Sequence, residues 1–255
     1  MNIGIQTFTI RKAQKKSITK AYMPLIRLGI RSFEVARIKF NKKNALEIKS
    51  LVDEHGIEIS AIQVKPHDVI ENKDSVVDFC RTVGCKRVII SMLPFRCILG
   101  REKVFYDFLS TLDPLYESYS AEGITLGYHH HNWEYMTLSS KKTRMEELLS
   151  KTEKIKFVSD TYWSAKSGVL PAKQLRDFSK RLLGVHLRDI TVYRKGLSMP
   201  TRNSTIGEGF IDFEETLAAA MDAGCEYLVI EEKTKTPYES IEKSYGYLNS
   251  LNEKK

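Results

Sequence analysis

Residues 127–135, GYHHHNWEY, place three of the six histidines of the chain side by side. Imidazole is a common metal ligand and also carries protons near neutral pH. Side chains alternate between the two faces of an extended strand, so His129 and His131 share one face and His130 lies on the other. We therefore expect His129 and His131 to act in one site and His130 to face the surrounding helices.

Carboxylates and a further histidine close other apolar runs of the chain. Their positions are Glu34 in SFEVAR, Asp160 in KFVSD, His186 in GVHLRD, and the adjacent pair Glu231 and Glu232 in YLVIEE. Strand alternation separates Glu231 from Glu232 without saying which of them faces inward. These residue types are those that bind metal ions, and their use at the ends of apolar runs indicates a shared site.

One unit recurs along the chain: a polar helical segment, a glycine and then a short apolar run. Its six copies cover residues 27–36, 54–64, 82–91, 121–130, 181–190 and 222–232. In each copy the glycine is predicted to end a helix in the left-handed conformation, with a strand directly after it. Two further apolar runs, residues 2–10 and 154–160, bring the number of predicted strands to eight.

Eight strands separated by helix-length segments in 255 residues match an α/β fold, the (β/α)8 TIM barrel. An open doubly wound sheet is the alternative, but it usually has fewer strands, and no GxGxxG follows the first predicted strand. No linker or low-complexity segment divides the chain, so we predict one domain over residues 1–255. The carboxyl ends of barrel strands meet at one face, where the residues closing these runs are expected to form the site.

Composition limits the partners and the compartment that the chain suits. It has no run of about 18 apolar residues, and its first charges follow its first apolar run, unlike in a signal peptide, so we predict a cytoplasmic protein without a membrane partner. Cys80, Cys85, Cys97 and Cys225 lack CxxC spacing and are predicted to be reduced packing residues. The net charge of +8 comes from scattered lysine runs without interleaved aromatic residues, which argues against a specific nucleic-acid partner.

The motifs and their order resemble the sugar isomerase/epimerase superfamily with a xylose-isomerase-like barrel, which also contains inosose dehydratases and zinc AP endonucleases. The matching segments are IGIQTFTIR as the opening strand, GYHHHNWEY beside the pattern YHNHxxEF, SDTYWSAKSG, GVHLRD, IGEGFIDF, and YLVIEE as the last strand. The resemblance extends over nearly the full chain. It implies a xylose-isomerase-like TIM barrel that binds one divalent metal ion.

By this resemblance the metal ligands are the residue that ends the fifth strand, here His129, together with Asp160, His186 and Glu231. Many relatives carry glutamate in the position of His129, so the chain departs from the common pattern there. A mixed set of imidazole and carboxylate ligands suits Mn²⁺, Zn²⁺ or Co²⁺, and less obviously Mg²⁺, which prefers oxygen ligands. His131 corresponds to a position that resembles a catalytic histidine of relatives that eliminate or hydrate keto-sugars.

The resemblance implies isomerisation or epimerisation of a ketose or related sugar through an ene-diolate that a metal ion stabilises. Glu231 or His131 is the expected base. The expected substrate contacts are Glu34, Glu134, Trp163 and Arg188. Cations for a sugar phosphate are offered by Arg11, Lys65, Arg188 and residues 191–203, although the sequence leaves both a free and a phosphorylated sugar open.

Other functions fit parts of the same pattern. A lyase or hydratase acting on a keto-sugar or inosose would share the metal site and use His131 as its acid or base. An AP-endonuclease-like nuclease would suit the positive charge, but Trp163 stands where the resemblance places an additional metal-binding histidine in nucleases. A non-catalytic sugar-binding barrel would not need the metal ligands. The sequence leaves assembly into a homo-oligomer open.

Overall fold

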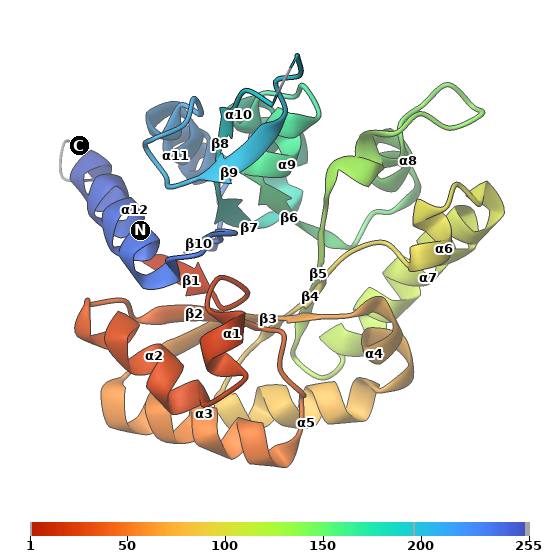
Figure 1. The fold of residues 1–255 in the computed structure, drawn as a ribbon. Helices are drawn as coiled ribbons and strands as arrows, with labels where there is room; N and C mark the ends of the chain where they lie inside the picture. The colour runs from red at the N-terminus through yellow and green to blue at the C-terminus, as the bar shows by residue number, and fades with distance from the viewer. Residues whose placement is uncertain (1, 196, 253–255) are drawn as a thin grey trace.

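The computed structural model of the protein describes residues 2–195 and 197–252. Within these residues, eight parallel strands close into a barrel in the order β1-β10-β7-β6-β5-β4-β3-β2 (Figure 1). The strands are β1 (Ile3–Gln6), β2 (Ser32–Ala36), β3 (Glu58–Val64), β4 (Arg87–Ile90), β5 (Thr125–His129), β6 (Lys156–Asp160), β7 (Leu182–Leu187) and β10 (Tyr227–Ile230). Each coincides with one of the eight predicted runs, so the predicted TIM barrel is confirmed.

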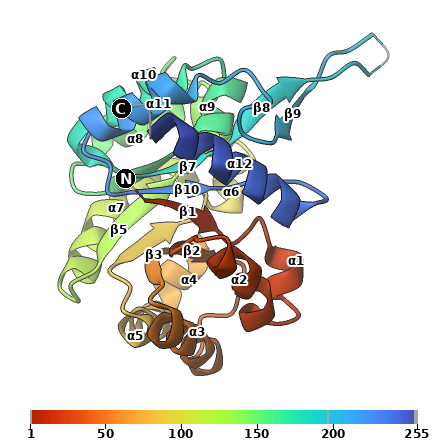
Figure 2. The same cartoon turned by 90° about the vertical axis from the view of Figure 1, so that its left-hand side faces the viewer.

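Helices surround the barrel and cover its outer face (Figures 1 and 2). They are α1 (Arg11–Gln14), α2 (Ile18–Arg27), α3 (Lys42–His55), α4 (Pro66–Glu71), α5 (Lys73–Val83), α6 (Phe95–Ile98), α7 (Glu102–Ser120), α8 (Arg144–Lys151), α9 (Thr161–Lys166), α10 (Pro171–Phe178), α11 (Phe213–Asp222) and α12 (Pro237–Asn252), with 3₁₀ turns η1 (Asn132–Tyr135) and η2 (Ser179–Arg181). Side-chain caps start several of them: Ser17, Thr143 and Asp212 each accept a hydrogen bond from a backbone N–H in the first turn of the helix that follows.

Five of the six recurrent glycines end helices as predicted. Gly29, Gly56, Gly84, Gly123 and Gly224 all have positive φ angles. The prediction is wrong for Gly184, which lies inside β7, while the preceding chain turns at Ser179 with φ of 45°. Glycine is needed at position 184 to leave room for an aromatic ring. A Cβ there would lie 2.3 Å from Cζ of Tyr227, the strand partner of Gly184 in β10.

The interior of the barrel is filled by a small apolar cluster separate from the large core between strands and helices. Its members are Ala61, Ile89, Val158, Leu183, Tyr227 and Val229, all buried. Because strand side chains alternate, the residues that continue this inward row toward the carboxyl ends point into the same space. Asp160 follows Val158 and Glu231 follows Val229 in this way, so two carboxylates of the candidate site lie above the apolar floor.

A feature that the sequence did not predict interrupts the pattern after β7. Strands β8 (Asp189–Val192) and β9 (Thr201–Ser204) pair in an antiparallel hairpin that projects from the barrel (Figure 2). The four cysteines are buried and free, as predicted. Among the described helices, none combines the length and apolar character that crossing a membrane requires.

Candidate active site

Four potential metal ligands converge at the carboxyl ends of neighbouring strands. His129 ends β5, Asp160 ends β6, His186 lies in β7 and Glu231 follows β10. All four residues are buried, and each offers a ligand atom within 4.8 Å of those of the other three. The register explains part of this, because Asp160 and Val229 are both strand partners of His186. The structure thus brings together the four residues that the sequence motifs single out as ligands.

His186 is held between two carboxylates. Its Nε2 lies 2.9 Å and 3.0 Å from the two oxygens of Glu34, and its Nδ1 lies 3.0 Å from Oε2 of Glu231. Burial lowers the pKa of His186, but the nearby carboxylates of Glu34 and Glu231 outweigh burial and raise it to about 10. Glu34 also accepts a hydrogen bond of 2.8 Å from the Tyr227 hydroxyl. Glu34 and Glu231 thus fix the orientation of the His186 imidazole from its two sides.

Glu34 lies outside the lining of the cavity. Its side chain is fully buried and directed at His186 and Tyr227. A carboxylate in this position sets the tautomer and direction of an imidazole ligand. We therefore assign Glu34 to positioning His186, in place of the substrate contact that the sequence predicts.

The four potential ligands His129, Asp160, His186 and Glu231 are called the ligand group below. Arg188 bridges its two carboxylates. Its Nη1 lies 3.0 Å from Oδ2 of Asp160 and 3.1 Å from Oε1 of Glu231. Burial raises the pKa of Asp160, but Arg188 and His129 outweigh this and lower it well below its usual value. The pKa of Glu231 is lowered in the same way, burial being outweighed by Arg188 and His186. Both groups are therefore ionised at neutral pH, the state that a metal ligand requires.

His129 supplies the test of whether a cation fits this group. Both ring nitrogens are buried without a hydrogen-bond partner in the described part of the chain, although Nε2 lies 3.4 Å from Oδ2 of Asp160. A buried polar atom without a partner costs free energy, which coordination would remove. Two imidazoles and two carboxylates also match the ligands of first-row divalent metals. The residues present therefore fit one divalent ion.

His131 and His130 face opposite sides, as strand alternation predicts. The His131 ring lies 4.8 Å from the His129 ring and 5.2 Å from the Trp163 ring, and it lines the cavity. The His130 ring instead packs against Phe178 of α10, and its Nε2 accepts a hydrogen bond of 3.1 Å from the backbone N–H of Asp160. Burial and the charge of His129 lower the pKa of His130 to about 3. His130 is a neutral packing residue that supports the Asp160 backbone.

Glu231 and Glu232 also face opposite sides, one the cavity and the other the surrounding helices. Glu231 lines the cavity, whereas Glu232 is buried toward α12 and accepts a hydrogen bond of 2.5 Å from Ser244. Alternation therefore continues through YLVIEE into the residues after β10, and it places Glu231 on the inner side.

Glu134 supports the loop that carries His131. Its side chain is fully buried and accepts hydrogen bonds from the Tyr128 hydroxyl and, at 2.8 Å, from the backbone N–H of His131. It does not line the cavity. The structure therefore places Glu134 against the backbone of His131 at the start of η1, outside the cavity lining.

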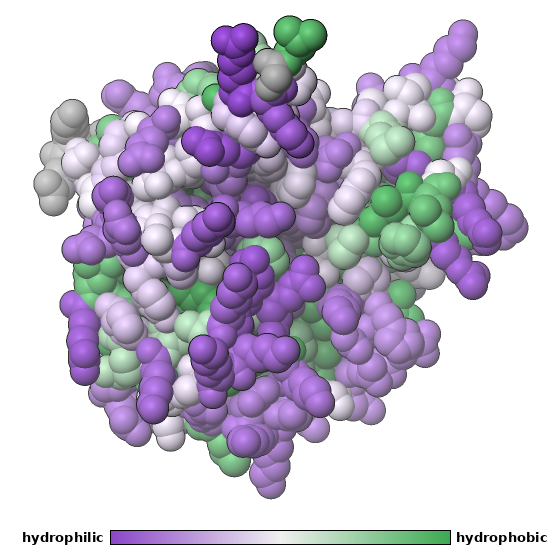
Figure 3. Space-filling model, in the orientation of Figure 1, coloured by the Kyte–Doolittle hydropathy of each residue, from purple (hydrophilic) through white to green (hydrophobic). Residues whose placement is uncertain are grey.

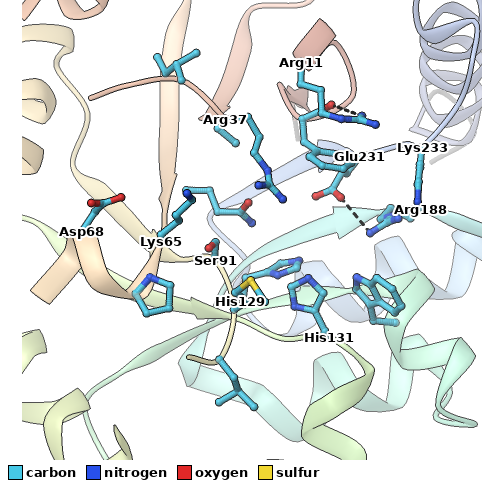
Figure 4. Close-up of a pocket in the computed structure, with 18 of the residues that line it drawn as sticks. Arg11, Arg37, Lys65, Asp68, Ser91, His129, His131, Arg188, Glu231 and Lys233 are labelled. Carbon is cyan, nitrogen blue, oxygen red and sulfur yellow. Dashed lines mark hydrogen bonds and ion pairs between the residues drawn. The ribbon is translucent and has the colours of Figure 1, made fainter. Parts of the chain in front are cut away.

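A cavity of about 1390 Å³ opens over the ligand group (Figure 4). Trp163 and Arg188, both predicted substrate contacts, line it beside His129, His131 and Glu231. Its position at the carboxyl ends of the strands is where TIM barrels carry their active sites. Sequence reasoning missed Arg37 in the lining and Tyr227 behind Glu34. Each had a signal, because Arg37 directly follows the second predicted strand and Tyr227 shares the inner face of its strand with Glu231.

Comparison with known families agrees with this geometry. The profile of the family described as xylose isomerase-like TIM barrel matches residues 25–251. The chain belongs to this family. Comparison with curated proteins gave no match.

Solved structures share the barrel at low sequence identity. A sugar phosphate isomerase/epimerase from Parabacteroides distasonis has a TM-score of 0.77 at 20% identity, covering 98% of this chain and 93% of that one. A probable 3-DHS dehydratase, AsbF, from Bacillus anthracis has a TM-score of 0.73 at 12% identity, covering 98% and 99%. A xylose isomerase-like barrel from Mycobacterium smegmatis, in complex with magnesium, has a TM-score of 0.71 at 10% identity, covering 98% and 96%. At these identities the similarity establishes the fold.

Proposed function

We propose that the protein is a metal-dependent isomerase or epimerase that moves a proton beside the carbonyl group of a ketose or related sugar. One observation carries the proposal: His131 lines the same cavity as His129 and Glu231, two of the four residues of the ligand group, so a base and a cation site face one substrate space. Membership of the xylose isomerase-like family supports it, as do neighbours that include sugar isomerases and epimerases.

The ligands proposed for one divalent ion, Mn²⁺, Zn²⁺ or Co²⁺ before Mg²⁺, are His129, Asp160, His186 and Glu231. When bound, such an ion supplies Lewis-acid polarisation of a carbonyl oxygen and its neighbouring hydroxyl. The protein holds the ligands ready for it: Arg188 keeps Asp160 and Glu231 ionised, and Glu34 orients His186. A magnesium complex of one barrel of this type leaves Mg²⁺ as an alternative.

His131 is the residue that we assign to proton transfer, with Glu231 as the second candidate. Burial and the charge of His129 lower the pKa of His131 well below its usual value, so its ring is neutral at pH 7. Its Nδ1 is buried without a hydrogen-bond partner among the described residues, and the ring lines the cavity, so no protein donor occupies this nitrogen. The rings of Trp133 and Trp163 lie 5.1 Å and 5.2 Å from the His131 ring and restrict its orientation.

Elimination of water from a keto-sugar is the second candidate function. The favouring observation is the unpartnered imidazole of His131, because the proton that it removes from carbon can leave with the departing hydroxide as water. A neighbour described as a probable dehydratase has the same fold. This reaction would use the same cavity and the same ligand group, so the two candidates differ in the product that forms.

The test is solvent-proton exchange with and without the metal site. Purified protein, stripped of metal and reloaded with Mn²⁺, is incubated in D₂O with a panel of ketoses and keto-sugars, and deuterium incorporation is followed by NMR. We expect exchange into at least one sugar, with an isomer or epimer as product. Asp160→Asn keeps an oxygen that can accept the hydrogen bond from the backbone N–H of Trp163, but it removes the negative charge of the carboxylate. Metal content and exchange should therefore both fall.

Loss of water without an isomer or epimer would instead favour the lyase. Metal-dependent incision of abasic duplex DNA that disappears in Asp160→Asn would overturn the proposal in favour of a nuclease. Full metal content in Asp160→Asn and in His186→Gln would contradict the assigned ligand group.

A further inference from the structure

The cavity carries an excess of positive charge that the ligand group does not use. Among aspartates and glutamates in the described chain, Asp68 and Glu231 line it, and Glu231 is already paired with Arg188. Lysines and arginines from several segments share the lining: Arg11, Arg37, Lys39, Lys65, Lys233 and Lys235. Figure 3, drawn in the orientation of Figure 1, shows hydrophilic side chains gathered in the middle of the face turned toward the viewer. A cleft lined by one sign of charge concentrates ligands of the opposite sign.

None of these six cations forms an ion pair in the described part of the chain, and Arg37 and Lys65 are the two that neighbouring strands bring to one wall. Arg37 has the Phe8 ring at 5.3 Å as its recorded contact, and Lys65 forms no ion pair. By contrast, lysines on the outer helices commonly pair along their own helix, as Lys49 does with Asp53. Like charges held together without counter-charge repel one another. An anionic ligand would remove that cost, whereas the hydroxyl groups of a neutral sugar would not.

The backbone brings Arg37 and Lys65 to the same wall. Arg37 directly follows β2 and Lys65 directly follows β3, and these strands are neighbours with Ala36 paired to Gln63. Arg37 has a φ of 61°, an unfavourable conformation for a residue with a Cβ, which persists where the surrounding structure enforces it. Figure 4 shows the Arg37 guanidinium pointing into the cavity toward Glu231, with Lys65 on the same side.

Cavity size leaves room for a group beyond the sugar ring. The volume of about 1390 Å³ exceeds the roughly 300–1,000 Å³ of ordinary small-molecule sites. His129, His131 and Arg188 lie on β5 to β7 and the segments that follow them, away from β2 and β3 in the strand order. A substrate whose reacting carbons lie at His131 and Glu231 can therefore extend a substituent toward Arg37 and Lys65.

We propose that the substrate is a sugar bearing an anionic group, a phosphate or a carboxylate, and that Arg37 and Lys65 form the subsite that binds this group. The inference rests on the proposed function for the orientation of the substrate, but the subsite itself can be tested without turnover. Guanidinium and ammonium groups bind phosphate and carboxylate oxygens through charge-assisted hydrogen bonds.

The probes are inorganic phosphate, D-fructose, D-fructose 6-phosphate and D-glucuronate, with binding measured by titration calorimetry at low ionic strength. The test variant is Arg37→Gln/Lys65→Gln. The matched control is Arg27→Gln/Lys43→Gln, which removes the same two residue types from exposed positions outside the cavity. Equal metal content and thermal midpoints in the variants verify that fold and ligand group are intact.

We expect the anionic probes to bind to the parent and to the control, and the test variant to bind them about ten- to a hundredfold more weakly, as loss of hydrogen bonds to charged groups implies. The preference for D-fructose 6-phosphate over D-fructose should shrink in the test variant alone. Tighter binding of D-fructose 6-phosphate than of D-glucuronate identifies the group as phosphate, and the reverse identifies it as carboxylate.

Equal loss of affinity in both double variants would mean that net charge, and not a subsite, attracts anions, and it would overturn the inference. So would undetectable binding of every anionic probe, or equal affinity for D-fructose and D-fructose 6-phosphate. If anions bind through Arg37 and Lys65 but no sugar exchanges protons with solvent, the proposed function fails and the subsite stands.

Discussion

Three adjacent residues of one type, His129, His130 and His131, have different surroundings and therefore different expected roles. His129→Ala should lower metal content because it removes a ligand of the group. His131→Gln should retain metal but lower turnover about 10² to 10⁴-fold, the usual cost of losing a positioned acid or base. His130→Gln should change neither strongly, because His130 packs on Phe178 away from the cavity and a glutamine oxygen can also accept the hydrogen bond from the Asp160 N–H.

Metal analysis of the three purified variants, followed by exchange rates on the sugar found active, measures all three effects. Metal loss confined to His130→Gln would mean that the side-chain alternation assigned to β5 is off by one residue. Thermal midpoints serve as the control, since a variant that unfolds would lose metal for a trivial reason.

At the scale of elements, the pairing of β7 with β10 couples barrel packing to the candidate site. Gly184 leaves space for the Tyr227 ring, Tyr227 donates to Glu34, and Glu34 orients His186. Gly184→Ala places a methyl group 2.3 Å from Tyr227 and should displace the ring, with a typical overpacking cost of about 1–3 kcal/mol. We expect a lower thermal midpoint and weaker metal binding in the same variant.

Tyr227→Phe separates the two effects because it keeps the ring and removes only the hydroxyl. It should weaken metal binding through Glu34, at a smaller cost in stability than Gly184→Ala. Unchanged metal affinity in both variants, measured by competition with a chelator, would contradict the chain of contacts from β10 to His186.

The elements also show why the sequence predicted some features and missed others. The strands were predictable because left-handed glycines end five of the preceding helices, a local signal. That His129, Asp160, His186 and Glu231 lie together could be predicted because they stand at or near the carboxyl ends of those strands. The contact of Glu34 with His186 could not be predicted, because the two residues are 152 positions apart and meet only when the barrel closes. The proximity of Arg37 to Lys65 depends on the register of β2 and β3, and the β8–β9 hairpin on pairing across a loop, which residue types alone do not encode.

At the scale of the whole molecule, metal binding should stabilise the fold. A ligand at 100 times its Kd adds about 2.7 kcal/mol to the free energy of unfolding. For a chain of this length, that corresponds to roughly 5–10 °C in the thermal midpoint. Differential scanning fluorimetry with Mn²⁺ and with EDTA measures the difference, which should vanish in Asp160→Asn. A rise of equal size in that variant would place the stabilising ion elsewhere.

The size of this stabilisation should depend on pH through His186. Burial opposes its charge, but the carboxylates of Glu34 and Glu231 raise the pKa of His186 to about 10 in the metal-free protein, above the usual 6.5. The protonated ring therefore stabilises the metal-free fold fully below pH 6.5, and that contribution is lost as the pH rises toward 10. A metal ion requires the unprotonated ring, so it competes with this proton. The rise in midpoint caused by Mn²⁺ should consequently grow from pH 6.0 to pH 8.5, and a rise that is constant or shrinks over this range would exclude His186 as a ligand.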